Sequence, residues 1–410
     1  MPITSQITPS ARFTAVRGSG CHLYDASGRA YLDCTSGIGV TSTGHCHPQV
    51  VAAVVAQAST LVHAQCATVR HPGLEVLADR LTQITPDGIN TFFITTTGTE
   101  AVEASIKLAR HATGRTEIVA FRGGFHGRTA GSLACTTSKP AYRAGTGPLM
   151  GGVHIAEYPY ARRLGLRQDE VAAHSLAVLD SMLTTEVAPD EVAAFLVEPV
   201  LGEGGYVPAD PAFLAGLRSR ADAYGILLIV DEVQTGFGRT GTMFTCDRYG
   251  LTPDILVMAK GMASGYPLAA IGAAGSLMAK ARPGSQGGTY AGNAVAVAAS
   301  LATLDVFAAE NLVNNAEIKG AILTANLIGL QSRHAGLVAE VRGLGLMIGV
   351  ELTVDAAGTR RILDACEDAG LLLLACGPAG NVVRWVPPLT ITAGELAGAV
   401  AVFDAALGTL

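Results

Sequence analysis

The sequence predicts an α/β protein built around a buried, largely parallel β-sheet. Short apolar runs of strand length alternate with stretches of helical periodicity, and continuous apolar runs are typical of strands covered on both faces. The five clearest runs are 92–94, 118–121, 194–197, 227–230 and 255–258. With 410 residues, of which 49% are hydrophobic and 15% charged, the chain is long enough for two domains with a substantial core.

The elements before this sheet begin with a β-hairpin. Residues 24–33 hold two strand-like runs around a Ser-Gly turn, which is a hairpin signature. Residues 48–58 and 74–84 follow with helical apolar patterns, and the second helix is expected to end before Pro86.

The elements after the sheet form a second unit. An alanine-rich helix near residue 300 leads away from a glycine-rich loop, and strands are expected at 345–352 and 381–386. No repeat or flexible linker is present, so we expect a domain boundary within a helix. We assign 1–45 to the N-terminal part of a small domain, 46–300 to the large domain and 301–410 to the C-terminal small domain.

Composition and charge exclude several classes of function. The net charge of −6 without basic clusters argues against nucleic acid and acidic membranes, and no apolar run reaches the ~20 residues of a membrane helix. Eight cysteines without CxxC pairs, and no signal-peptide pattern, favour the cytoplasm. The adjacent residues His45, Cys46 and His47 cannot all face one ion, so we expect no metal. Neither nucleotide-binding glycine motif occurs.

Two charged residues follow predicted strands, and together they indicate pyridoxal 5'-phosphate (PLP). Asp231 would emerge at the carboxyl edge of the sheet, where it could pair with a cationic ring nitrogen. Lys260 follows the next apolar run, and a partly buried amine there could condense with an aldehyde. Taken singly, a helix-capping aspartate and a surface lysine are the plainer interpretations. The pair is what PLP chemistry requires.

With these residues in place, the sequence resembles the class III (ω-amino acid) aminotransferases. The resemblance spans nearly the whole chain, and within the family it is greatest to the 4-aminobutyrate enzymes. Its motifs are TGTEAVEA from Thr97, FHGRT from Phe125, VEPVLGEGG from Val197, GTYAGN from Gly288, and the segments around Asp231 and Lys260. It implies the type I PLP-transferase (aspartate-aminotransferase-like) fold, with a large PLP-binding domain, a smaller α/β domain, and a homodimer with shared active sites.

The resemblance also assigns the cofactor contacts. Residues 96–99 precede a predicted helix, whose free N–H groups and dipole suit a phosphate, although an ordinary threonine cap has the same pattern. By resemblance, Lys260 carries the cofactor and Asp231 pairs with its ring nitrogen. The remaining cofactor-binding residues are Gly98 and Thr99 at the phosphate, Thr289 at the phosphate of the neighbouring subunit, Phe125 and Val233 on the two ring faces, His126 beside Phe125, and Gln234 at the ring hydroxyl.

The substrate contacts implied by the family are two arginines and a glutamate. Arg384 matches the arginine that grips the α-carboxylate of glutamate, and Glu203 matches the residue that pairs with it when the substrate offers no α-carboxylate. Arg128 matches the position that holds the far carboxylate. Ile38 and Glu198 complete the expected substrate site. Leu201 departs from the family, which usually has glutamine there.

The expected reaction moves the terminal amine of an ω-amino acid, 4-aminobutyrate first, to 2-oxoglutarate, giving glutamate. Ile38 and the stretch from Tyr142 to Pro148 follow the 4-aminobutyrate pattern, whereas Phe125 follows the acetylornithine pattern, so acetylornithine or another ω-amino acid is the alternative donor. An aminomutase or decarboxylase of the same family is less favoured because Arg384 and Glu203 are retained. A non-catalytic PLP-fold binding protein would be expected to lose Lys260, Asp231 or the phosphate loop, and none is lost. The expected partners are therefore small molecules: an amino donor and a keto acid.

Overall fold

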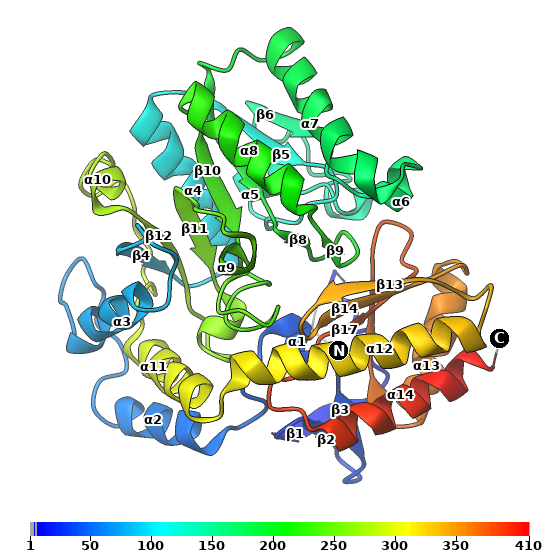
Figure 1. Ribbon diagram of the computed structural model, residues 1–410. Helices are drawn as coiled ribbons and strands as arrows, with labels where there is room; N and C mark the ends of the chain where they lie inside the picture. The colour runs from blue at the N-terminus through cyan, green and yellow to red at the C-terminus, as the bar shows by residue number, and fades with distance from the viewer. Residues whose placement is uncertain (1–3, 5, 410) are drawn as a thin grey trace.

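A seven-stranded sheet forms the centre of the larger lobe (Figure 1). The computed structural model describes residue 4 and residues 6–409. The strand order is β4-β12-β11-β10-β7-β5-β6, and only β12 runs antiparallel to its neighbours. The strands are β4 (Thr91–Thr95), β5 (Glu117–Phe121), β6 (Val153–Ala156), β7 (Val192–Val197), β10 (Leu227–Asp231), β11 (Ile255–Met258) and β12 (Ala269–Ala273). All five predicted runs lie in this sheet, which confirms the predicted α/β fold.

Helices cover both faces of this sheet, which explains its continuous apolar strands. In β10, Ile229 packs on the face covered by α4 (Gly98–Thr113), while Leu228 and Val230 point to the other face. That other face is covered by α7 (Gln168–Thr185) and α8 (Pro211–Tyr224). Because successive side chains of a strand alternate between faces, both kinds of position must be apolar here.

The large lobe continues into a group of helices below the sheet (Figure 1). Helix α11 (Ala294–Ala309) packs against α2 (Pro48–Ala58) and α3 (Pro72–Thr82). The prediction was right for α2 and placed α3 two residues too late at both ends. After α11 the chain bends into α12 (Leu312–Arg333), the long helix that crosses into the small lobe.

The small lobe contains two four-stranded sheets. One has the order β13-β14-β17-β16, and the other pairs N-terminal strands with a C-terminal one in the order β1-β2-β3-β15. The strands are β1 (Ala15–Ser19), β2 (His22–Asp25), β3 (Ala30–Asp33), β13 (Val338–Leu344), β14 (Met347–Leu352), β15 (Leu371–Leu372), β16 (Leu374–Cys376) and β17 (Val382–Trp385). Strands β2 and β3 form the predicted hairpin. Strand β15 pairs in parallel with β3 of that hairpin, and the division into domains at 45 and 300 stays a prediction.

Helices α12, α13 (Ala356–Asp368) and α14 (Ala393–Leu407) cover the small lobe (Figure 1). The remaining short elements are α1 (Ser36–Gly39), α5 (Ala130–Cys135), α6 (Ala161–Leu164), α9 (Thr245–Tyr249), α10 (Gly275–Met278), β8 (Val200–Leu201), β9 (Val207–Pro208) and the 3₁₀ helices η1 (Pro140–Tyr142) and η2 (Lys260–Met262). Among the described residues, no single helix has the length and apolar composition to cross a membrane. By those two criteria alone, the bent pair α11 and α12 passes when taken together.

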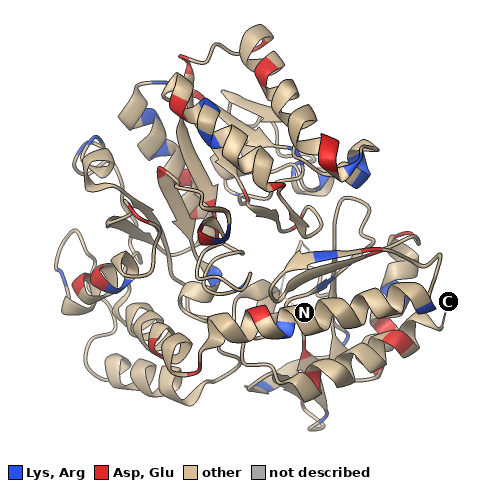
Figure 2. Ribbon diagram, in the orientation of Figure 1, with Lys and Arg blue, Asp and Glu red and all other residues tan. Residues whose placement is uncertain are grey.

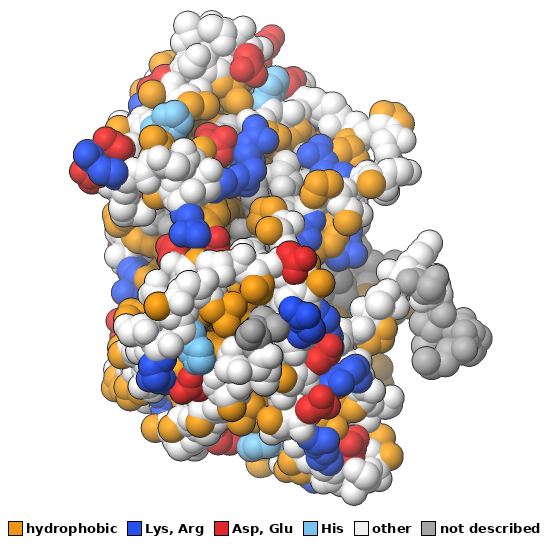
Figure 3. All heavy atoms as spheres, turned by 90° about the vertical axis from the view of Figure 1, so that its right-hand side faces the viewer, with side chains coloured by type: hydrophobic (Ala, Val, Ile, Leu, Met, Phe, Trp, Pro, Cys, Tyr) orange, Lys and Arg blue, Asp and Glu red, His pale blue; other side chains and the backbone are white. Residues whose placement is uncertain are grey.

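Charged side chains of both signs are intermixed along the chain (Figure 2) and on the face displayed in Figure 3. Many pair locally. Arg333 lies 2.8 Å from Asp404, and the buried Arg342 lies 2.6 Å from Glu351. Such pairs neutralise each other at short range.

Candidate active site

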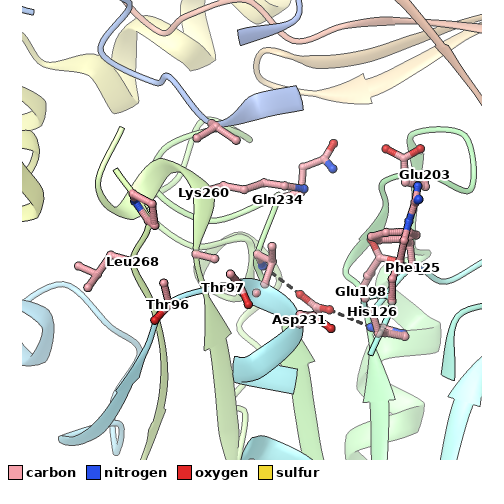
Figure 4. Close-up of a pocket in the computed structure, with 18 of the residues that line it drawn as sticks. Thr96, Thr97, Phe125, His126, Glu198, Glu203, Asp231, Gln234, Lys260 and Leu268 are labelled. Carbon is pink, nitrogen blue, oxygen red and sulfur yellow. Dashed lines mark hydrogen bonds and ion pairs between the residues drawn. The ribbon is translucent and has the colours of Figure 1, made fainter. Parts of the chain in front are cut away.

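A cavity of about 430 Å³ opens at the carboxyl ends of the central strands (Figure 4). Asp231 is the last residue of β10, Lys260 follows β11, and Thr96 follows β4. Open α/β sheets place ligands at this edge because the loops there converge. The lining residues are Val40, Thr96, Thr97, Gly98, Thr99, Phe125, His126, Gly127, Arg128, Glu198, Glu203, Asp231, Val233, Gln234, Ala259, Lys260, Gly265, Tyr266, Pro267 and Leu268.

Asp231 and His126 form a buried pair on the cavity wall. His126 Nδ1 donates to Asp231 Oδ2 at 2.8 Å, and the backbone N–H of Val233 donates to Asp231 Oδ1 at 3.0 Å. Burial alone would lower the pKa of His126, but the hydrogen bond and charge of Asp231 outweigh it and raise that pKa. Asp231 is therefore a fixed carboxylate that can hold a cationic group facing it.

Lys260 lies on the other side of Asp231, in η2 at the end of β11 (Figure 4). Its backbone has a φ of 46°, a left-handed conformation that is uncommon for lysine and recurs at functional sites. Burial lowers the pKa of its amine, against the opposing charges of Glu203 and Asp231. A lysine with a lowered pKa has a larger share of the neutral, nucleophilic amine.

The start of α4 forms a cradle beside these two residues. Thr97 caps the helix through a capping box with Glu100, whose carboxylate also accepts from the backbone N–H of Thr96 at 2.9 Å. The first N–H groups of the helix, at Gly98 and Thr99, have no intrahelical acceptor. The hydroxyl of Thr99 is tied to Ser132 at 2.7 Å, which fixes this turn. Such a turn is a ready anion site.

Phe125, Glu198 and Gln234 complete the inner wall. Glu198 accepts backbone N–H groups from Phe125 at 2.8 Å and from Gly202 at 2.9 Å, so its carboxyl joins two loops. Burial raises the pKa of Glu198 to about 7, against the opposing charge of His126. Among the described residues, none bonds to the buried Oε1 of Gln234, which leaves an acceptor for a bound group.

Glu203 and Arg384 form a buried ion pair between the two lobes. Both side chains are largely buried, and Arg384 Nη1 donates to Glu203 Oε1. Burial favours the neutral form of each group, but the opposite charge outweighs it, so the pKa of Glu203 is lowered and that of Arg384 is raised. Leu201 does not prevent this pair, because its side chain packs against Gly123 and Gly204 outside the cavity lining.

Arg128 lines the cavity on the Phe125 side, while two predicted site residues lie elsewhere. Ile38 is 41% exposed and lines a neighbouring cavity together with Arg384. Thr289 is exposed, and its carbonyl accepts from His63 Nε2 at 2.8 Å. Within a single chain, neither side chain lines the main cavity.

Several lining residues were not predicted from the sequence. Thr96, Val40 and the segment from Gly265 to Leu268 line the cavity through loops that carry no chemical signature of their own. Thr96 belonged to the presumed phosphate loop, Val40 to the stretch around Ile38, and Gly265 to the small-residue loop after Lys260, but none of them was assigned a role from the sequence.

Comparison with known proteins identifies the family. The family model described as "Aminotransferase class-III" matches residues 5–407. The chain belongs to the class III aminotransferases. It is 41% identical to the 4-aminobutyrate aminotransferase GabT of Escherichia coli (strain K12), over 93% of this chain and 90% of the relative. It is 40% identical to the 5-aminovalerate aminotransferase DavT of Pseudomonas putida, over 89% and 86% of the two chains.

A solved structure extends this agreement to three dimensions. An amine transaminase from an uncultivated Pseudomonas species, solved with PLP bound, superposes with a TM-score of 0.92 at 32% identity, over 100% of this chain and 98% of the other. This class III enzyme is accordingly a PLP-dependent aminotransferase with the type I PLP-transferase fold, as its sequence predicted.

The residues on the cavity wall fit PLP. Asp231 offers a fixed carboxylate for the ring nitrogen, and Gln234 has a buried, unsatisfied acceptor nearby. The turn at Gly98 offers free N–H groups for the phosphate. The backbone there must pass close to the ring site, because a Cβ on Gly98 would lie 3.0 Å from Val233 Cγ1.

Proposed function

We propose that this aminotransferase moves the terminal amine of an ω-amino acid, with 4-aminobutyrate as its donor, to 2-oxoglutarate. The observation that carries the proposal is the buried Glu203–Arg384 pair beside Arg128, which has no ion-pair partner among the described residues. A donor with one distant carboxylate needs one free arginine. A dicarboxylate acceptor needs two.

The pair supplies the second arginine only when it is required. While the donor is bound, Glu203 neutralises Arg384, which would otherwise be a costly unpaired charge in a buried position. When 2-oxoglutarate binds, its α-carboxylate takes the place of Glu203, and Arg128 holds its other carboxylate. Arginine suits this exchange because its planar guanidinium remains charged and binds carboxylates bidentately.

The chemistry divides between the cofactor and the protein. PLP, when bound, supplies an aldehyde that condenses with the donor amine and an electron-poor ring that stabilises charge developing on the amine carbon. Asp231, oriented by His126, keeps a proton on the ring nitrogen. Lys260 Nζ would hold the cofactor at rest, and its amine would move the proton at the donor carbon. Val233 and Phe125, which both line the cavity, would confine the ring.

We further propose that the enzyme is a cytoplasmic homodimer. Apolar side chains are exposed on α2, on α3 and on the glycine-rich loop before α11. The exposed fraction is 59% for Val55, 48% for Val76 and 68% for Tyr290. Surface of this kind suits a protein–protein interface. A second copy over this surface would bring its Thr289 toward the phosphate turn, which Thr289 does not reach within its own chain.

The experiment that tests the donor is a half-reaction without any keto acid. The absorbance of the bound cofactor is followed after adding 4-aminobutyrate or, separately, N-acetylornithine. We expect 4-aminobutyrate to convert the cofactor to its amine form. Conversion by N-acetylornithine alone would favour acetylornithine as the donor, which is the alternative that the phenylalanine at position 125 indicates. Conversion by neither would overturn both donors.

A further inference from the structure

Tyr142 connects two parts of the cavity that handle different ends of the substrate. Its ring packs edge-on against Phe125, with centroids 5.5 Å apart and planes at 75°. Its face is covered by Arg128, whose guanidinium carbon lies 4.3 Å from the ring centroid. The aromatic ring therefore stands between the cofactor-facing phenylalanine and the arginine proposed to grip the distant carboxylate.

The segment that carries Tyr142 is anchored to the same loop as Phe125. The backbone N–H groups of Thr137 and Ser138 both donate to the carbonyl of Gly124, at 2.8 and 3.1 Å, one residue before Phe125. Thr137 Oγ1 in turn accepts from the N–H of Gly123 at 2.8 Å. Tyr142 then ends the 3₁₀ helix η1 and is held as a half-buried side chain. These contacts fix the ring relative to Phe125.

Arg128 itself has few contacts that would hold it in place. It lies on the exposed rim, and no carboxylate of the described residues pairs with it. A long, flexible side chain in such a position depends on stacking to define the direction of its guanidinium. Tyr142 provides that stacking, and it belongs to neither the phosphate turn nor the Glu203–Arg384 pair.

We propose that Tyr142 is a positioning residue that fixes Arg128 at a set distance from the reacting amine and thereby selects the chain length of the donor. This proposal rests on the proposed function, because it assumes that Arg128 binds the carboxylate of an ω-amino acid. With the ring removed, Arg128 would sample several positions and accept shorter and longer donors alike. The Tyr142 hydroxyl also forms a hydrogen bond with Arg128, while the stacking involves only the ring, so Tyr142→Phe separates the two contacts.

The test uses the PLP-loaded enzyme and two variants, Tyr142→Leu and Tyr142→Phe. Single-turnover half-reactions are measured with β-alanine, 4-aminobutyrate, 5-aminovalerate and 6-aminohexanoate, and with butylamine, which has no carboxylate. The wild type should prefer one chain length. Tyr142→Leu should weaken the apparent affinity for the preferred donor about tenfold and flatten the profile, because a loosely held Arg128 misplaces the substrate. The butylamine rate should not change, and Tyr142→Phe, which keeps the stacked ring and loses only the hydrogen bond to Arg128, should retain most of the wild-type chain-length preference.

Three results would overturn the proposal. Tyr142→Leu could retain the chain-length profile, butylamine could lose as much rate as 4-aminobutyrate, or Tyr142→Phe could behave like Tyr142→Leu. Failure of the proposed function would look different, because the wild type would then react with none of the ω-amino acids. In that event, glutarate binding to the PLP-loaded enzyme is measured by calorimetry. Weaker binding in Tyr142→Leu than in Tyr142→Phe still supports the positioning of Arg128, and equal binding in all three proteins rejects it.

Discussion

Arg384 of β17 and Glu203 of the loop after β8 are joined across the two lobes by a buried ion pair. The same loop is tied to the small lobe by the N–H of Gly377, which donates to the carbonyl of Glu203 at 3.0 Å. In β14, Gly349 lies directly opposite Arg384 of the paired strand β17. Tyr206 packs against Gly349, where a larger side chain would be crowded. The pair is therefore built into the packing between the lobes, and changing either partner has consequences for stability as well as for chemistry.

Glu203→Ala should destabilise the protein in the absence of substrate. Removing one partner of a buried ion pair leaves the other charge uncompensated, which costs about 3 kcal/mol. Urea unfolding of the apoprotein checks this value. The control is Glu203→Gln, whose side-chain oxygen can still accept from Arg384, so it should lose clearly less stability. Equal losses in the two variants would show that the neutral hydrogen bond to Arg384 contributes little and that the charge on Glu203 accounts for the loss.

Arg384→Ala should separate the two half-reactions. Losing a bidentate, charge-assisted contact to the α-carboxylate should lower kcat/KM for 2-oxoglutarate by about a hundredfold. The half-reaction with 4-aminobutyrate should fall by much less, because that donor has no α-carboxylate. Single-turnover rates of the two halves provide the measurement. Losses of the same size in both halves would argue against the exchange of Glu203 for a substrate carboxylate.

Gly127→Ala should disrupt the turn that supports the phosphate cradle. Gly127 has a φ of 136°, and a Cβ there would lie 2.2 Å from Thr99 Oγ1 and 2.5 Å from Ser132 Oγ. We expect a lower melting temperature and weaker PLP binding, measured by cofactor fluorescence titration. Gly145→Ala is the matched control, since Gly145 also has a positive φ, of 75°, but nothing within 4 Å of its Cβ site. That control should show only the backbone strain, about 1 kcal/mol, and normal PLP binding.

Lys260→Ala should abolish turnover without unfolding the enzyme. The buried amine has a lowered pKa because its charged form is poorly solvated, so the fold does not depend on that charge. Turnover is measured with the donor preferred by the wild type, and thermal melting of the apoprotein reports the fold. Substantial activity in this variant would contradict the assignment of Lys260. The control Lys260→Arg keeps a positive charge but offers no amine that can condense with an aldehyde, and it should be equally inactive.

The sequence revealed the centre of this site better than its rim. Asp231 and Lys260 were recognisable because each follows an apolar strand, and the carboxyl ends of parallel strands meet at one edge. Strand β12 was missed because its Ala-Ala-Ile-Gly-Ala sequence has weak strand propensity and depends on pairing with β4 and β11. The positioning contacts of Tyr142 were missed for a related reason. The partners of its ring, Phe125 and Arg128, come from another segment of the chain. The 3₁₀ helix that carries Tyr142 has three residues, too few to show a periodic pattern in the sequence.

Glu198→Gln should change how the stability of the apoprotein depends on pH. Burial raises the pKa of Glu198 to about 7 in the folded protein, from its ordinary value of 4.5. Between these values the folded state binds more protons than the unfolded state, so the stability contributed by this group is present below pH 4.5 and is lost as the pH rises toward 7. Glutamine cannot titrate. The unfolding free energy of the wild type, relative to the variant, should therefore fall steadily across this window.

Urea unfolding at a series of pH values measures this difference. Comparison with the variant removes the contributions of other titrating groups, provided that they are unchanged. Glutamine can accept only one of the two N–H groups that Glu198 accepts from Phe125 and Gly202, so the variant should also lose a constant amount of stability, about 1 kcal/mol. A difference that stays constant from acid to neutral pH would mean that Glu198 has the same pKa in the folded and unfolded states and is therefore ionised at neutral pH. The carboxyl beside His126 and Asp231 would then be a second negative charge facing the cofactor site at neutral pH.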